Sequence, residues 1–150
     1  MKKLNLNLVF ITIVLLVNSC TFTSSYLNRE DDNNDGKAFL HEFFNKIDSN
    51  NYAGIDAMVG DSLKQMAGPN GISKLVKYIT LRAGKYKSYS IDDKYIRAVT
   101  GSINETSYNY KLSVTYDKGV IEEIIGMEKQ NGSKIKLRSY HANSDLLIEY

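Results

Sequence analysis

The chain has 150 residues, of which 43% are hydrophobic, 24% charged and 11% aromatic. This composition is typical of a globular protein and argues against extended disorder or a fibrous repeat, and the length suits a single domain. The net charge of +2 comes from Lys2 and Lys3, without which basic and acidic residues are equal in number. A neutral domain gives no electrostatic reason to expect nucleic-acid binding. The single cysteine excludes an intrachain disulfide and a metal site made of several cysteines.

The first 20 residues have the parts of a signal peptide. Lys2 and Lys3 form a positive end, and an apolar run follows from Leu8 to Val17. A membrane-spanning helix needs roughly 20 apolar residues, so this run is too short for one and suits the core of a signal peptide. We predict a signal peptide over residues 1–19, with cleavage after Ser19.

The residues around the lone cysteine indicate the kind of signal. Leu16-Val17-Asn18-Ser19-Cys20 resembles the lipobox of bacterial lipoproteins, in which a small residue precedes the cysteine. The resemblance implies diacylglycerol on the sulfur of Cys20, often with a third chain such as palmitate on the new amino group. Each buried CH₂ contributes about 0.8 kcal/mol, so two chains anchor a protein stably to a membrane.

The residue after the cysteine bears on the destination. Thr21, rather than Asp, follows Cys20, which in a Gram-negative cell favours the outer membrane, on its periplasmic side. Two alternatives remain for this segment: an ordinary secretory signal with a coincidental cysteine, and an uncleaved anchor.

Two parts are predicted after the signal peptide. The stretch from Thr21 to Gly36 is polar and has neither a helical nor a strand period. We therefore predict a lipidated flexible tether over residues 20–35 and a single domain over residues 36–150.

Helices are predicted in the first half of the domain. The first covers residues 37–49, where Phe39, Phe43 and Ile47 recur at four-residue spacing. A short helical turn follows, and then a further helix over residues 72–83.

After Gly84 the apolar period changes from 3.6 to 2, which predicts four strands. The first covers residues 86–100, with a bend at Asp92-Asp93. In the clearest strand, five alternating residues share one apolar face: Tyr108, Tyr110, Leu112, Val114 and Tyr116. Asp117-Lys118-Gly119 turns into a third strand, and Asn131-Gly132 is a hairpin signal that leads into the fourth.

Helices followed by a meander of strands predict an α+β fold, with the helices on one face of a curved four-stranded antiparallel sheet. This order of helices and strands resembles the cystatin-like and nuclear-transport-factor-2-like cone domains, and most of all the small domains of unknown function found in bacterial lipoproteins. The resemblance covers about residues 36–141 and is carried by Glu123-Ile124-Ile125-Gly126-Met127, Asn131-Gly132 and Lys134-Ile135-Lys136-Leu137-Arg138-Ser139-Tyr140. Ile135 and Ser139 depart from the family pattern, which commonly has Trp and Gly at these positions.

Glu122 and Glu123 are the acidic pair of greatest chemical interest. Neighbours on a strand point to opposite faces, and both faces of this strand are apolar, so one carboxylate would point into the cone. A carboxyl group in an apolar pocket has a raised pKa and can act as a general base. The family resemblance adds that related cone-fold isomerases use an inward carboxylate with Tyr as donor.

We accordingly take Glu123, Tyr108, Tyr110 and Phe43 as candidate pocket-lining residues. The alternative, which we favour, places Glu123 at the rim of the sheet, bonded to a Lys or Arg of a neighbouring strand.

No other motif supports catalysis. His41 and His141 are the only histidines, they form no paired motif, and the helical period turns His41 to solvent. Phosphate-binding loops and a nucleophile motif are absent from the sequence. The sequence assigns no catalytic residue, no metal ligand and no cofactor.

These observations predict a membrane lipoprotein with a non-catalytic domain that binds an envelope protein or a small apolar ligand at the open end of the cone. The alternatives are a cone-fold enzyme of isomerase or hydrolase type, and a toxin-neutralising or structural envelope lipoprotein.

Overall fold

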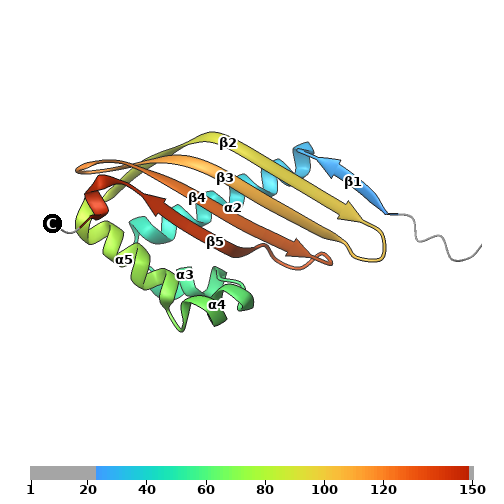
Figure 1. Cartoon of the computed structure of the whole chain (residues 1–150), viewed down its shortest axis with the longest axis horizontal. Coiled ribbons are helices and arrows are strands. Elements are labelled where there is room, and N and C mark those ends of the chain that lie inside the picture. The colour runs from blue at the N-terminus through green and yellow to red at the C-terminus, as the bar shows by residue number, and fades with distance from the viewer. Residues whose placement is uncertain (1–22, 149–150) are drawn as a thin grey trace, which may run out of the picture.

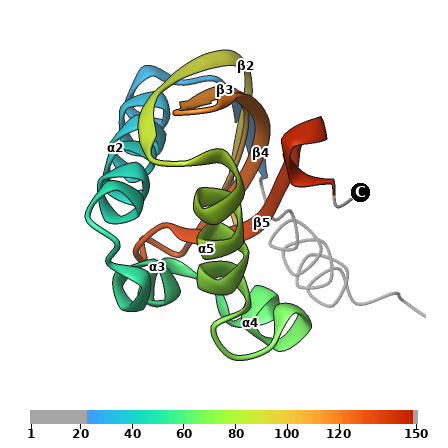
Figure 2. The ribbon, with the colours of Figure 1, turned by 90° about the vertical axis from the view of Figure 1, so that its left-hand side faces the viewer.

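The computed structural model describes residues 23–148 and has the predicted α+β architecture. Its antiparallel sheet has five strands in the order β1-β2-β3-β4-β5, so every strand pairs with its neighbour in sequence. The helices lie on one side of the sheet, which curves around them (Figures 1 and 2). The predicted signal peptide and Cys20 lie outside the described residues.

The bounds of the elements are as follows. The strands are β1 (Ser24–Leu27), β2 (Tyr86–Thr100), β3 (Glu105–Tyr116), β4 (Gly119–Gln130) and β5 (Lys136–Asn143). The helices are α2 (Glu30–Asp48), α3 (Tyr52–Met58), α4 (Asp61–Ala67) and α5 (Gly71–Ala83), and a 3₁₀ turn, η1 (Asp145–Leu147), follows β5.

The segment predicted as a tether is folded from Ser24 onward, so that prediction is wrong for residues 24–35. β1 pairs with the end of β2, with Ser24 opposite Thr100, and adds a fifth strand to the predicted four. Asn28, with φ of 49°, turns the chain out of β1, and α2 begins at Glu30 rather than near residue 37.

Local polar contacts explain how so polar a stretch folds. The backbone N–H of Asn28 donates to the carbonyl of Ile96 at 2.9 Å, and its side-chain Oδ1 accepts from the N–H of Ile96 at 2.9 Å. The first turn of α2 is acidic, which suits the positive end of the helix dipole. Arg29 and the buried Asp32 form an ion pair at 2.6 Å beside it. These contacts involve polar groups and require no regular spacing of apolar residues, so the sequence pattern did not reveal them.

The core lies between α2, α3, α5 and the inner face of the sheet. The apolar stripe of α2 is buried, and Phe44 stacks on Tyr86 and Tyr89 at ring distances of 5.1 and 4.6 Å. The alternation predicted for β3 is confirmed, since its five apolar-face residues are all buried. α5 is also bonded to the 3₁₀ turn η1, because Tyr78 donates a 2.8 Å hydrogen bond to the carbonyl of Leu147.

The turns of the meander are also confirmed. Tyr116 pairs with Gly119 around the two-residue turn Asp117-Lys118, which fixes the register of β3 against β4. The bend predicted at Asp92-Asp93 is an irregularity in the pairing of β2 with β3 between Ile91 and Asp93. The strand predicted after Asn131-Gly132 is β5, which begins at Lys136 and continues to Asn143.

Candidate functional site

Glu123 is enclosed in the core, on the inner face of β4. It is paired with Leu112 of β3 and Ala142 of β5, and its side chain is 0% exposed. Ile121 and Ile125, two residues away on either side, are equally buried. The inward direction follows from the strand period, because Glu123 shares its face with these isoleucines.

Two tyrosine hydroxyls bind the buried carboxylate. Tyr116, at the end of β3, donates to Oε1 of Glu123 at 2.8 Å. Tyr140, on β5, donates to Oε2 at 2.8 Å. Each carboxylate oxygen therefore has one phenolic donor, an arrangement that offsets part of the cost of burying a charge.

The environment favours the protonated form of Glu123. Burial raises the pKa of Glu123 to about 7, and the hydrogen bonds from Tyr116 and Tyr140 offset part of this rise because they favour the charged form. Burial and the neighbouring carboxylate raise the pKa of both tyrosines, so they act as hydrogen-bond donors. The site can thus hold or release one proton near neutral pH.

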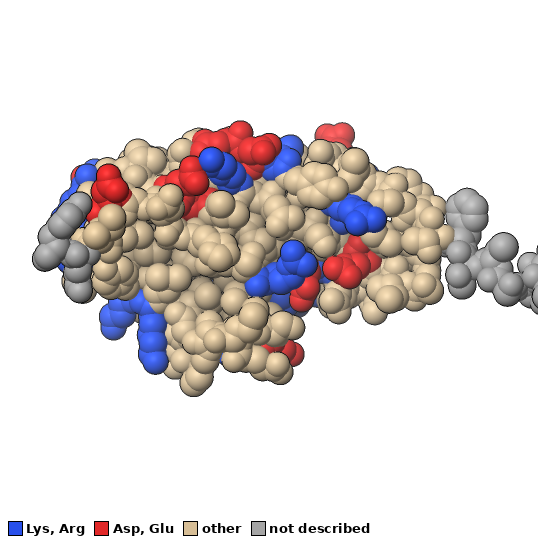
Figure 3. Space-filling model, viewed as in Figure 1, with Lys and Arg blue, Asp and Glu red and all other residues tan. Residues whose placement is uncertain are grey.

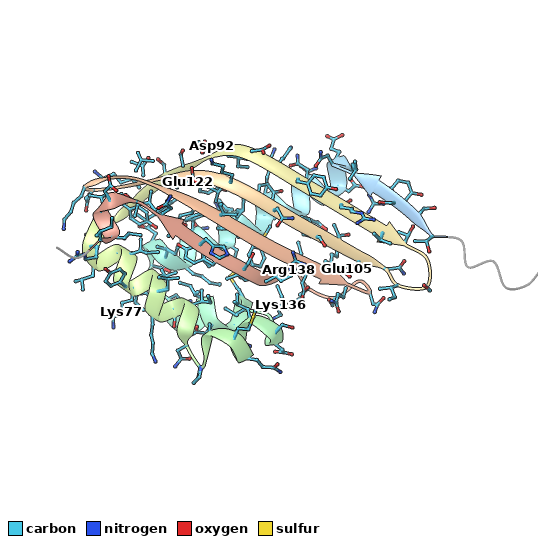
Figure 4. All side chains as sticks on the ribbon, in the orientation of Figure 1. Lys77, Asp92, Glu105, Glu122, Lys136 and Arg138 are labelled. Carbon is cyan, nitrogen blue, oxygen red and sulfur yellow. The ribbon has the colours of Figure 1, made fainter. Side chains whose placement is uncertain are left out.

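The prediction that Glu123 lies at the rim of the sheet is wrong. It is Glu122, on the outer face, that makes the expected ion pair, with Lys111 of β3 at 2.9 Å. No register shift interrupts the pairing of β3 with β4 between the two residues, so Glu122 and Glu123 keep opposite faces. Figure 4 shows Glu122 on the outer side of the sheet, near Asp92 of β2.

The other candidate pocket residues lie in the core. Tyr108, Tyr110 and Phe43 are all 0% exposed, and the ring of Phe43 lies 5.8 Å from that of Tyr140. The hydroxyl of Tyr110 is buried against Gly36 of α2 and finds no hydrogen-bond partner among residues 23–148. These side chains belong to the same core cluster as Tyr116 and Tyr140, but the hydroxyls that bind the carboxylate of Glu123 are those of Tyr116 and Tyr140.

Hollows open elsewhere on the surface of the described residues. Five of them, with volumes of about 290 to 540 Å³, are lined by side chains other than Glu123, Tyr116 and Tyr140. The largest, about 540 Å³, is a groove between α2, α3 and the start of β5. Its floor includes Phe39 and Met58, and its walls carry Lys129 and Asp35, which pair at 2.7 Å.

The histidines lie apart from these features. His41 is exposed on α2, as predicted, and His141 is exposed on β5. Over residues 23–148 no three His, Cys, Asp or Glu side chains are placed to hold a metal ion together. In the same part of the chain, no helix combines the length and apolar character needed to cross a membrane.

Tyr116 and Tyr140 are the site residues that sequence reasoning missed. The signal for Tyr116 was present, because the turn at Asp117-Lys118 fixes the register and puts Tyr116 on the same face as Glu123.

Comparison with protein-family models, curated proteins and solved structures found no match to this chain.

Proposed function

We propose that this chain is a lipid-anchored bacterial envelope protein that carries a non-catalytic binding domain. The support for the anchor is the sequence Leu16-Val17-Asn18-Ser19-Cys20, which places the only cysteine where a lipobox requires it. Lipid on Cys20 would hold the domain at a membrane, and Thr21 favours the periplasmic side of the outer membrane.

The observation that carries the non-catalytic part is the enclosure of Glu123. A general base must come within hydrogen-bond reach of its substrate. Glu123 is 0% exposed, and both of its oxygens are already bound by tyrosine hydroxyls at 2.8 Å. The pair of tyrosines fills the space next to the carboxylate, so a structural role in the core accounts for all three residues.

The groove between α2 and α3 is the best-supported place for a partner or a small apolar ligand. It combines apolar side chains at its floor, Phe39 and Met58, with charged groups at its edge. This combination suits an occupant with an apolar part and a polar surround. Lys136 spans one side of the groove and donates a 2.7 Å hydrogen bond to the carbonyl of Ala57 (Figure 4).

Palmitate labelling tests the anchor. Radiolabelled palmitate should enter the native chain and should not enter a Cys20→Ala variant, whose signal peptide should also remain uncleaved. A native chain that is released with a free thiol would overturn the anchor.

Variants in the groove test the binding role. Ala57 is exposed and lines the groove, and Ala57→Arg would fill it, whereas Ala53→Arg adds the same side chain elsewhere on α3. A partner captured by the fragment of residues 21–150 from envelope extract should bind wild type and Ala53→Arg and lose binding to Ala57→Arg. Equal capture by all three chains would place the binding surface elsewhere.

The alternative of a cone-fold enzyme is favoured by one observation, the carboxyl group of Glu123 with a pKa near 7 between two phenolic donors. It predicts that Glu123→Gln abolishes the biological activity of a chain that remains folded. The non-catalytic proposal predicts that the activity is retained. A toxin-neutralising role predicts instead that the captured partner is a toxin.

A further inference from the structure

The folded domain begins very close to the proposed anchor. Only Thr21, Phe22 and Thr23 lie between Cys20 and Ser24, the first residue of β1. A fully extended residue spans at most about 3.6 Å, so the Cα atoms of Cys20 and Ser24 are within about 14 Å of each other. Lipid on Cys20 would therefore hold the start of β1 at the level of the headgroups, with no long linker between them.

β1 determines which end of the sheet lies nearest to the anchor. Ser24 pairs with Thr100, the last residue of β2, and the turn Gly101–Asn104 follows directly. The end of β4 lies at this same end of the sheet, because Gln130 of β4 pairs with Glu105, the first residue of β3. Figure 1 shows the start of β1 beside the turn between β2 and β3.

The two turns at this end are joined to each other. The N–H of Asn131 donates to the carbonyl of Asn104 at 2.7 Å. The side-chain Oδ1 of Asn131 accepts a hydrogen bond from the N–H of Asn104, and the Oδ1 of Asn104 accepts one from the N–H of Gly101 at 3.2 Å. The turns thus form one hydrogen-bonded surface rather than two independent loops.

The chemistry of this surface suits a lipid headgroup layer. Residues 100–104 and 130–133 contain no charged side chain, and Ile103 projects with 61% of its surface exposed. In Figure 3 this end of the visible face, at the right, shows no Lys, Arg, Asp or Glu. An exposed isoleucine among uncharged polar groups can enter the boundary between headgroups and acyl chains at little desolvation cost.

We propose that the surface formed by residues 100–104 and 130–133, referred to here as the turn surface, rests on the bilayer that holds the lipid of Cys20, with Ile103 inserted. This inference rests on the lipid anchor proposed above. The domain then stands upright on the membrane, with its strands directed away from it. β3 has 12 residues and each strand residue rises about 3.3 Å, so the turn at Asp117-Lys118 stands about 40 Å above the headgroups.

Fluorescence quenching on vesicles tests this orientation. The thiol of Cys20 is blocked by lipid in the mature chain, so an introduced cysteine is the only free thiol. Ser102→Cys provides a thiol for the label on the turn surface, and Lys118→Cys provides one at the opposite end of the sheet. Both positions are exposed. Each lipidated chain would carry an environment-sensitive fluorophore and be reconstituted in phosphatidylethanolamine–phosphatidylglycerol vesicles that contain a headgroup-spin-labelled lipid.

We expect several-fold quenching of the label at position 102 and little at position 118. Adding Ile103→Glu to Ser102→Cys should reduce the quenching, whereas Ile103→Val should leave it nearly unchanged. The proposed orientation would be overturned if vesicles that carry the protein quenched the two labels equally, or quenched the label at position 118 more strongly. Either result would leave the anchor intact. Failure of the chain to float with the vesicles, together with a mass that lacks lipid, would overturn both the anchor and the orientation.

Discussion

The hydroxyl of Tyr116 lies 2.8 Å from Oε1 of Glu123, on the next strand of the meander. The turn at Asp117-Lys118 between them sets the register, and the long tyrosine side chain spans the remaining distance along the inner face of the sheet. Because Glu123 is completely buried, this bond and its counterpart from Tyr140 decide how the core tolerates a carboxyl group. The stability of the domain should accordingly depend on pH.

We predict that the free energy of unfolding falls as the pH rises from about 4.5 to about 7. Burial raises the pKa of Glu123 from the ordinary glutamate value of 4.5 to about 7 in the folded chain. Between these values the folded chain keeps its proton and the unfolded chain has lost it, so the folded state is progressively disfavoured, by about 3 kcal/mol in total. Urea unfolding at pH 5 and pH 8 measures the change.

A pair of adjacent variants isolates the contribution of Glu123. Glu123→Gln resembles the protonated carboxyl group and does not titrate, so this part of the pH dependence should disappear and the variant should be at least as stable as wild type at pH 8. Glu122→Gln, on the outer face, should keep the wild-type pH dependence and change stability by less than about 1 kcal/mol, because its ion pair with Lys111 is half-exposed. The same pH profile in Glu123→Gln and wild type would contradict the prediction.

Removing one of the tyrosine donors should be costly. Tyr140→Phe leaves Oε2 of Glu123 buried without a hydrogen bond, which should destabilise the domain by about 1–3 kcal/mol at pH 8. It should also raise the pKa of Glu123 further, because the lost bond favoured the charged form. Thermal or urea unfolding of the variant over the same pH range provides both measurements.

Tyr110→Phe is the matched control for this change. Tyr110, like Tyr140, is buried on the inner face of the sheet, but its hydroxyl has no partner among the described residues. Deleting this hydroxyl should leave the stability unchanged or slightly increased, since no hydrogen bond is lost. A similar loss in both variants would mean that the hydroxyl of Tyr110 is also bonded.

Gly36→Ala should destabilise the domain, although this substitution within a helix ordinarily stabilises it by about 1 kcal/mol. A Cβ at position 36 would overlap the hydroxyl of Tyr110 and come within 3.0 Å of its ring carbon Cζ and 3.1 Å of Cδ1 of Tyr108. α2 would have to move away from the sheet, at a cost of about 1–3 kcal/mol. The free energy of unfolding in urea measures the effect.

Two further variants test the stated cause. Lys37→Ala, on the exposed side of α2, should be nearly neutral. Tyr110→Phe combined with Gly36→Ala should recover part of the lost stability, because the phenylalanine lacks the overlapping hydroxyl. Purely additive effects of the two substitutions would show that the contact between Gly36 and Tyr110 is not the cause.

The period of apolar residues was sufficient to predict most of the fold. The stripe of Phe39, Phe43 and Ile47 defines α2 over its buried half, and the alternation from Tyr108 to Tyr116 defines β3. The turn at Asp117-Lys118 was evident because aspartate, lysine and glycine follow a clearly alternating strand. Where burial alone determines the structure, the pattern of apolar residues reveals it.

The features that were missed depend on polar contacts between distant residues. β1 and the first turns of α2 are fixed by bonds such as those between Asn28 and Ile96, which leave no period in the sequence. The partners of Glu123 depend on the reach of two tyrosine side chains across three strands. The ion pair with lysine predicted for Glu123 is instead made by its neighbour Glu122.

Asn28 should be important for the fifth strand. Asn28→Ala removes the acceptor of the Ile96 N–H and leaves alanine, which tolerates the left-handed region less well than asparagine, at a φ of 49°, for a combined cost of about 1–3 kcal/mol. Asn28→Gly loses the same acceptor without the backbone strain and should cost less. Amide exchange of Ile96 should accelerate in both variants, and unchanged protection would contradict the assigned bond.

The pairing of β1 also has a mechanical consequence. Ser24–Leu27 runs antiparallel to Arg97–Thr100, and the hydrogen bonds of such a pair lie across the strand direction. A force applied at the amino-terminal side and directed along β1 would load these bonds together in shear, instead of opening them one after another. The short edge strand would thus act as a clamp that transmits tension from a lipid anchor to the sheet and protects α2 from being unwound.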